Sequence, residues 1–216
     1  MEIINREFQE YAEAYSSKEP EELSRLNRET HVHHLFPRML SGHLQGRLLS
    51  MISHIINPTR ILEVGTYTGY SAICLAEGLA PGGVLHTIEI NNENEDIIRK
   101  YLVKTNNTDR IILHFGDAIK IIPTINETFD LVFLDADKER YIDYFKLVIK
   151  KVKPGGIILA DNVFWDGKVL DDNVKDKESE GIRKFNQFIR EDNRVEQVLL
   201  TVRDGIMIIR KKELAA

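Results

Sequence analysis

Short apolar runs alternate with amphipathic stretches after Pro58, whereas residues 2–56 carry a helical pattern that breaks near Pro20 and Pro37. The runs are continuously apolar, which is typical of strands buried on both faces. They are RILEVG (60–65), VLHTIE (84–89), IILHF (111–115), DLVFLD (130–135) and GIILAD (156–161). Helix-like segments lie between them, near 69–79, 91–105, 117–122 and 138–152. This alternation predicts a parallel sheet covered by helices on both sides.

Two further strand-like runs close the chain, at 195–202 and 205–211, and only Arg203 and Asp204 join them. A connection this short cannot cross over a sheet, so these two strands must be antiparallel. We therefore expect one domain over 1–216, with an N-terminal helical segment (1–57) and an open α/β core (58–216). Ligands of such sheets bind beyond the carboxyl ends of the strands, so the candidate site residues are sought there.

Composition agrees with a soluble globular domain, with 43% hydrophobic and 29% charged residues in a chain of 216. The net charge of −5 disfavours nucleic acid as a partner without excluding a local basic stripe. Cys74 is the only cysteine, so no intrachain disulfide can form. No apolar run reaches the length of a membrane span, and the N-terminus lacks the apolar core of a signal peptide. A cytoplasmic protein without a membrane partner is expected.

The first strand end carries a glycine turn followed by a helical stretch, RILEVGTYTGYSAICLAEGL. Gly65 and Gly69 would allow the backbone to turn tightly and approach a ligand. Glu63 precedes the turn, and Glu89 ends the second strand, where a carboxylate is placed to bind two ribose hydroxyls. Taken alone, the turn favours a purely structural connection, whereas the combination of Glu63, Gly65, Gly69 and Glu89 on consecutive strands favours a cofactor site. A nicotinamide enzyme is a rival interpretation, but the G-x-G-x-x-G spacing is missing.

The fourth and fifth strand ends carry Asp135 and the pair Asp161-Asn162. If these strands are neighbours, their terminal side chains can converge, because adjacent strands lie about 4.8 Å apart. Carboxylate and carboxamide oxygens suit Mg²⁺ or a similar hard cation. The alternative is that these residues only cap a helix and a turn, settings in which Asp and Asn are also favoured.

Several motifs together resemble one family. LEVGTYTGYS followed by TIEIN resembles the S-adenosylmethionine site of class I methyltransferases, specifically the cation-dependent O-methyltransferases that include catechol and caffeoyl-CoA O-methyltransferases. FLDADKERY and LADNVFWDG follow in the expected order, PRMLSGHLQG resembles the segment that lies across the cofactor, and VRDGIMIIRK resembles the closing hairpin. The resemblance implies a Rossmann-like, doubly wound, mostly parallel seven-stranded sheet with an antiparallel C-terminal hairpin strand and extra N-terminal helices.

The resemblance also implies roles for individual residues. Asp135, Asp161 and Asn162 match the cation ligands, and Lys138 together with Asp135 matches the catalytic positions. The positions that match cofactor contacts are Ser41, Glu63, Gly65, Thr66, Ser71, Glu89, Asp117, Ala118 and Asp137. Trp165 and Asp166 fall on the substrate side, although the caffeoyl-CoA enzymes often carry asparagine where this chain has Asp166. Met207 stands where the animal catechol enzymes carry a substrate-binding glutamate, which favours the caffeoyl-CoA-like branch.

The implied activity is methylation of one hydroxyl of a catechol-like, caffeoyl-type small molecule, with S-adenosylmethionine and Mg²⁺, or another divalent cation such as Mn²⁺ or Ca²⁺. Lys138 would stabilise the phenolate or, with a lowered pKa, accept its proton. Two alternatives stay open at this point: methylation of a hydroxylated tRNA uridine, and a non-catalytic cofactor-binding protein on the same scaffold. The resemblance further implies a homodimer. His31, His33 and His34 have no metal-site spacing and are expected at the substrate entrance or a dimer contact.

Overall fold

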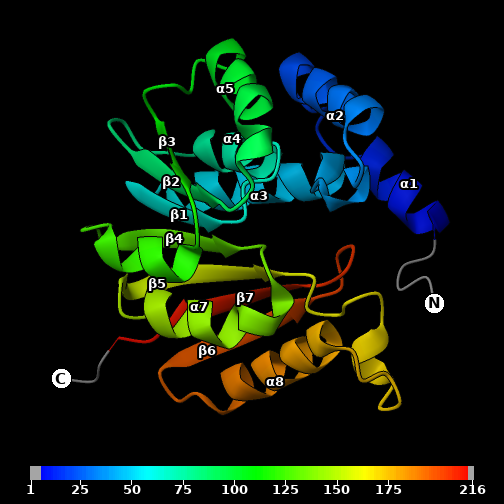
Figure 1. The fold of residues 1–216 in the computed structure, drawn as a ribbon, viewed down its shortest axis with the longest axis vertical. Coiled ribbons are helices and arrows are strands. Elements are labelled where there is room, and N and C mark those ends of the chain that lie inside the picture. The colour runs from blue at the N-terminus through cyan, green and yellow to red at the C-terminus, as the bar shows by residue number, and fades with distance from the viewer. Residues whose placement is uncertain (1–5, 214–216) are drawn as a thin grey trace.

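The computed structural model describes residues 6–213, and the strands in this part of the chain form one seven-stranded sheet (Figure 1). The strand order is β3-β2-β1-β4-β5-β7-β6. The strands are β1 (Arg60–Val64), β2 (Val84–Glu89), β3 (Ile111–Phe115), β4 (Phe129–Leu134), β5 (Val152–Asp161), β6 (Val195–Leu200) and β7 (Ile206–Lys211). Strands β1 to β5 pair in parallel, and β7 is antiparallel to both of its neighbours. The predicted sheet and its antiparallel closing hairpin are confirmed.

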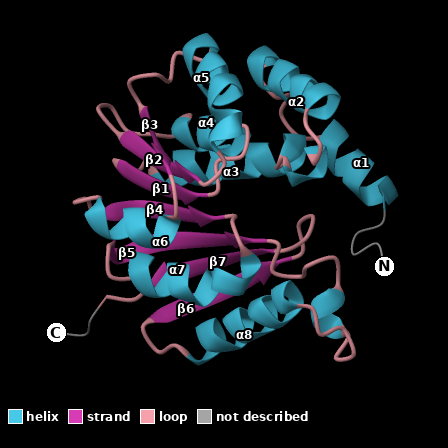
Figure 2. Cartoon of the chain, viewed as in Figure 1, coloured by secondary structure: helices cyan, strands magenta, loops and turns pink. Residues whose placement is uncertain are grey.

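Helices cover both faces of the sheet (Figure 2). The α-helices are α1 (Arg6–Ala14), α2 (Glu21–His33), α3 (Gly42–Ile56), α4 (Tyr70–Ala76), α5 (Glu95–Lys104), α6 (Ala118–Ile121), α7 (Tyr141–Val148) and α8 (Lys177–Glu191). Short 3-10 turns are η1 (Pro37–Met39), η2 (Asn92–Asn94), η3 (Ile122–Thr124), η4 (Lys138–Arg140) and η5 (Lys168–Leu170). The expected breaks coincide with the start of α2 after Pro20 and of η1 at Pro37. Within residues 6–213, no helix is long and apolar enough to span a bilayer. Residues 2–5 of the expected helical segment lie outside the described residues.

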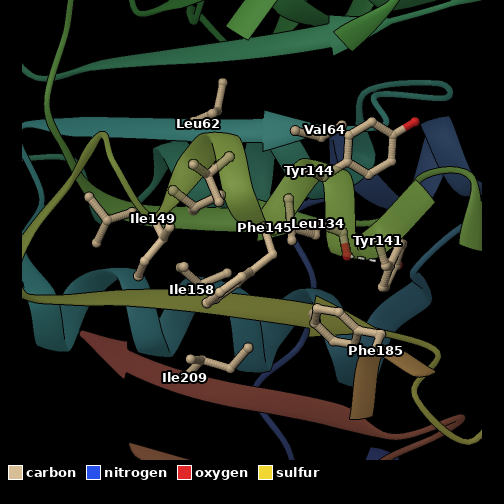
Figure 3. Packing of buried hydrophobic residues seen from close by; sticks show 14 of the residues in the cluster. Leu62, Val64, Leu134, Tyr141, Tyr144, Phe145, Ile149, Ile158, Phe185 and Ile209 are labelled. Carbon is tan, nitrogen blue, oxygen red and sulfur yellow. Dashed lines mark hydrogen bonds between the residues drawn. The ribbon is translucent and has the colours of Figure 1, made fainter. Parts of the chain in front are cut away.

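Two apolar clusters, one on each face, hold the layers together. Leu62 and Val64 of β1 belong to the cluster under α6, α7 and α8, in which Phe145 and Phe185 are fully buried (Figure 3). Ile61 of β1 belongs to the opposite cluster, with buried residues of α2 to α5. This division follows from the strand geometry, because successive side chains point to opposite faces.

The largest difference from the predicted strand boundaries is at β5, and the boundaries of β1, β4, β6 and β7 differ by one or two residues. Strand β5 begins at Val152 and not at Gly156, so Pro154 and Gly155 lie inside a strand. Val152 pairs with Phe129 at the start of β4, but a register shift separates this pair from the regular ladder that resumes at Ile157. Proline and glycine are tolerated in a strand at such irregularities. The helix expected over 138–152 correspondingly ends at Val148.

Candidate active site

A cavity of about 920 Å³ lies at the carboxyl ends of the parallel strands. Its wall combines the turns that follow β1, β2, β3 and β4 with the segment between α2 and α3. The structure brings most of the predicted site residues together in this wall. They are Ser41, Gly65, Thr66, Ser71, Glu89, Asp117, Ala118, Asp135, Asp137, Lys138, Asp161, Asn162 and Trp165.

The glycine turn after β1 lies directly against the end of β4. Gly65 has φ 99°, and a Cβ atom at this position would stand 1.8 Å from the carbonyl oxygen of Asp135. The Asp135 N–H donates to the Val64 carbonyl at 2.9 Å, and the Gly65 N–H donates to that of Ile88 at 3.0 Å. Only glycine fits this conformation and this approach. The turn after β1 is therefore in close contact with the end of β4, and residues of both segments line the cavity.

Glu89 ends β2 with its carboxylate fixed by backbone groups. One oxygen accepts the Tyr67 N–H at 2.6 Å and the other accepts the Asn91 N–H at 2.8 Å. Burial raises the pKa of Glu89 despite these hydrogen bonds. Each carboxylate oxygen can accept more than one hydrogen bond, so both keep capacity for hydroxyl donors in the cavity.

Glu63 does not reach the cavity wall. Its side chain is fully buried and accepts the Thr87 hydroxyl at 2.5 Å, while its Oε1 has no hydrogen-bond partner among the described residues. Burial raises the pKa of Glu63 to about 8, so the carboxyl group holds its proton near neutral pH. The structure thus places Glu63 beneath the glycine turn, and the direct cofactor contact implied by the resemblance stays a prediction.

Asp117 and Asp137 line the cavity and also act as N-terminal caps. Asp117 Oδ1 accepts the Ile119 N–H at 3.0 Å at the start of α6, and Asp137 Oδ1 accepts the Glu139 N–H at 3.1 Å at the start of η4. Asp117 also pairs with Arg140 at 3.1 Å. The cap of η4 is therefore Asp137 and not Asp135, which leaves Asp135 available to the cavity.

Asp135 and Asp161 converge because β4 and β5 are neighbours in register, with Leu134 opposite Ala160. Asp161 is 3% exposed, and its pKa is raised to about 6, first by burial and then by the negative charge of Asp135. Asn162 follows with φ 56°, in the left-handed region where asparagine is tolerated. Among the described residues, no three His, Cys, Asp or Glu side chains form a metal-binding group. The predicted set contains two carboxylates, and its third member is a carboxamide.

Lys138 is a buried ammonium group and not an exposed helix lysine. Its Nζ donates to Asp135 Oδ1 at 2.8 Å and to the Tyr141 hydroxyl at 2.7 Å, and it lies 5.9 Å from the centre of the Trp165 ring. Burial alone would lower the pKa of Lys138, but the charges of Asp135, Tyr141 and Asp161 outweigh burial and raise it. The surroundings of Lys138 thus favour its charged form, and both its roles, as partner of the phenolate and as proton acceptor, stay predictions.

Four residues near this group were not anticipated from the sequence. The Tyr141 hydroxyl lies 3.0 Å from the carbonyl oxygens of both Leu134 and Asp161, so it joins the ends of β4 and β5. Gln45, Arg203 and Asp204 surround Asp161 and Asn162 from the opposite side. All four lie in motifs that carried the family resemblance, Tyr141 in FLDADKERY, Gln45 in PRMLSGHLQG, and Arg203 and Asp204 in VRDGIMIIRK, but no role was assigned to them.

The segment after Asn162 carries the two residues expected on the substrate side, Trp165 and Asp166. Trp165 lines the cavity, whereas Asp166 is exposed and outside the lining, with its N–H bonded to Asp204 Oδ1 at 2.7 Å. Phe164 packs against Gly205. His33 and His34 line the cavity, whereas His31 does not, and the expected role at a substrate entrance or dimer contact stays a prediction. Met207 is 4% exposed in β7 and belongs to the core below α6 to α8.

Comparison with known proteins gives a consistent answer. A family model described as "O-methyltransferase" matches residues 13–212. A catechol O-methyltransferase from Niastella koreensis is 35% identical over 160 residues, 72% of each chain. A caffeoyl-CoA O-methyltransferase from Eucalyptus gunnii is 33% identical over 209 residues, covering 92% of this chain and 84% of that relative.

A crystal structure of an O-methyltransferase from Bacillus cereus in complex with SAH superimposes with a TM-score of 0.88 at 31% identity. The match covers 95% of this chain and 97% of that one. The sequence and the fold therefore agree. The chain belongs to the O-methyltransferase family that includes catechol and caffeoyl-CoA O-methyltransferases, and it is an S-adenosylmethionine-dependent enzyme.

Proposed function

We propose that the enzyme methylates one hydroxyl of a vicinal dihydroxy aromatic, of the catechol or caffeoyl type, and that it requires a divalent cation. The observation that carries this proposal is the convergence of Asp135, Asp161, Asn162 and Lys138 at one side of the cavity. The names of the catechol and caffeoyl-CoA relatives support the acceptor class.

The donor set fits a hard cation. Asp135, Asp161 and Asn162 offer oxygen atoms only, the ligand type that Mg²⁺, Mn²⁺ and Ca²⁺ prefer. These three residues would hold the ion. Because the negative charge of Asp135 raises the pKa of Asp161, a positive charge between the two carboxylates would relieve their repulsion. When bound, such a cation favours the ionised form of an acceptor hydroxyl and fixes its direction.

The remaining steps fall to the chain's own residues. Methyl transfer from a sulfonium to an oxyanion needs oxygen, carbon and sulfur in line, so the enzyme gains most from orientation. Lys138 keeps its positive charge and stands beside Asp135, where it stabilises the negative charge of the ionised acceptor. Trp165 provides an aromatic wall on the same side.

The cofactor subsite is proposed on the other side of the cavity. Glu89 would accept hydrogen bonds from two ribose hydroxyls, while the Gly65 turn lets the backbone approach the cofactor closely. Thr66, Ser71 and Ser41 line the space between this carboxylate and the acceptor side. Asp117, Ala118 and Asp137 complete the proposed cofactor wall.

The decisive experiment is methyl transfer to a panel of catechols and matched monophenols, with and without EDTA. We expect transfer to catechols only, lost with EDTA and restored by Mg²⁺ or Mn²⁺. Transfer that survives complete removal of metal would overturn cation dependence. Binding of S-adenosylhomocysteine without transfer to any catechol would instead favour the tRNA or non-catalytic alternative.

The homodimer implied by the resemblance stays a prediction. Large apolar side chains on two N-terminal helices are exposed and would suit such an interface: Phe8 and Tyr11 of α1, and Met51 and Ile55 of α3. Light scattering coupled to gel filtration measures the mass directly, and a mass of 24.9 kDa would exclude the dimer at that concentration.

A further inference from the structure

The connection between β6 and β7, residues 201–205, carries Arg203 and Asp204 and lies beside the proposed cation ligands of β5. Strand β7 runs antiparallel to β5, with Ile206 opposite Asp161, so the turn that precedes β7 lies next to the end of β5. Phe164 and Val163 donate backbone hydrogen bonds to Asp204 and Gly205, at 2.9 and 3.2 Å. The turn is therefore attached to the segment that carries Asn162.

Asp204 determines which way the Asn162 carboxamide points. Asp204 Oδ2 accepts the Asn162 Nδ2 group at 3.2 Å, while its Oδ1 accepts the Asp166 N–H at 2.7 Å. A carboxylate only accepts hydrogen bonds, so it selects the nitrogen of the carboxamide and turns the oxygen away from itself. The same contact holds the left-handed backbone of Asn162 and Asp166.

Arg203 reaches Asp161 through a second carboxamide. Its Nη1 donates to Gln45 Oε1 at 2.7 Å and also to the Ser41 carbonyl, and Gln45 Nε2 donates to Asp161 Oδ2 at 2.6 Å. Arginine only donates, so it selects the oxygen of Gln45 and directs the nitrogen to Asp161. Gln45 is 1% exposed, which fixes this orientation by packing as well.

We propose that Arg203 and Asp204, acting with Gln45, are the positioning residues of the cation site: Asp204 presents the Asn162 oxygen, and Arg203 with Gln45 fixes the Asp161 carboxylate. None of the three needs to contact the cation. The inference rests on the proposed cation site. Partners of this kind that orient metal ligands typically account for about 10- to 100-fold of metal affinity.

The test measures Mn²⁺ binding to the full chain by electron paramagnetic resonance of free Mn²⁺, and S-adenosylhomocysteine binding by calorimetry without metal. Asp204→Asn keeps nearly the same shape. It places an NH₂ group opposite one of the two hydrogen-bond donors, Asn162 Nδ2 or the Asp166 N–H, where Asp204 has an acceptor oxygen. Gln45→Met removes the hydrogen bonds that Gln45 forms with Arg203 and Asp161 while keeping the length of the side chain. Each variant is expected to raise the Mn²⁺ dissociation constant by about tenfold or more and to leave the S-adenosylhomocysteine constant within about twofold.

Asp171→Asn is a matched control. Asp171 Oδ1 likewise accepts a backbone N–H and a carboxamide Nδ2, both from Asn173, at 2.9 and 3.0 Å, but it does not line the cavity. This variant is expected to bind Mn²⁺ as the wild type does.

Three outcomes would overturn the inference. Unchanged Mn²⁺ affinity in Asp204→Asn and Gln45→Met, with S-adenosylhomocysteine still bound, would show that the ligands need no such support. Equal loss of both ligands would show a general role in folding. Wild-type protein that binds no Mn²⁺ would refute the cation site itself, and this inference with it.

Discussion

Substitution of Gly65 by alanine tests whether the close approach of two chain segments makes the loss of stability larger than the ordinary cost of a left-handed non-glycine residue. The added Cβ would stand 1.8 Å from the Asp135 carbonyl oxygen, although such contacts essentially never fall below 3.0 Å. The turn after β1 and the end of β4 must therefore separate by more than about 1 Å. Both segments carry proposed site residues, so the change affects binding as well as stability.

The expected loss of stability has two parts. A non-glycine residue at φ 99° costs about 1–2 kcal/mol, and forcing an extra methyl group into a packed region typically costs about 1–3 kcal/mol. Together these amount to roughly 2–5 kcal/mol. For a chain of this size each kcal/mol lowers the Tm by about 2–4 °C, so a decrease of about 10 °C is expected.

Gly82→Ala is the matched control, because Gly82 has φ 72° and nothing lies within 4 Å of the place that an added Cβ atom would take. It should lose only the backbone part, about 1 kcal/mol after the gain from a stiffer unfolded chain. Thermal unfolding of both variants, with S-adenosylhomocysteine titrations, provides the comparison. Equal Tm decreases in Gly65→Ala and Gly82→Ala, or normal ligand affinity in Gly65→Ala, would refute the reasoning.

The remaining predictions concern the two subsites and one buried carboxyl group. Asp161→Ala should abolish turnover and leave cofactor binding nearly intact, whereas Glu89→Ala should first weaken cofactor affinity. An equal loss of cofactor affinity in both variants, measured by calorimetry, would contradict two separate subsites. Lys138→Met should lower kcat about 10²- to 10⁴-fold with little change in S-adenosylhomocysteine affinity, and a near-normal kcat would remove Lys138 from the reaction. Glu63, with a pKa of about 8 against 4.5 for the free side chain, keeps its proton in the folded state after the unfolded state has lost it. Its contribution to stability should therefore fall as the pH rises from about 4.5 to 8, by up to ~1.4 kcal/mol per unit. Urea unfolding of Glu63→Gln across that range should show a flatter profile than the wild type, and parallel profiles would exclude this assignment.

The strands could be predicted because their apolar runs reflect burial on both faces, a property of each residue's own position. The direction of the Glu63 side chain follows from the geometry of strand β1. Leu62 and Val64 belong to the cluster below α6 to α8, so Glu63 between them points to the other face and toward Thr87. That alternation was present in the sequence.

The residues that hold the site together could not be predicted, because they are brought in by tertiary contacts. Gln45 precedes Asp161 by 116 positions, and no local pattern joins the two. Arg203 and Asp204 were identified as the connection between two strands and as part of the VRDGIMIIRK motif, without a role in the site. The structure places them beside β5 because β7 begins at Ile206, opposite Asp161.

The charges of the site also bear on the proposed cation. In their ionised forms Asp135 and Asp161 carry two negative charges and the buried Lys138 one positive charge, leaving an excess of one negative charge. An acceptor that binds with an ionised hydroxyl adds a second. The sulfonium of S-adenosylmethionine offsets only one of these two charges, so a further positive charge between the carboxylates would stabilise this largely buried group. A charged Lys138 therefore agrees with the proposed cation and with stabilisation of the ionised acceptor.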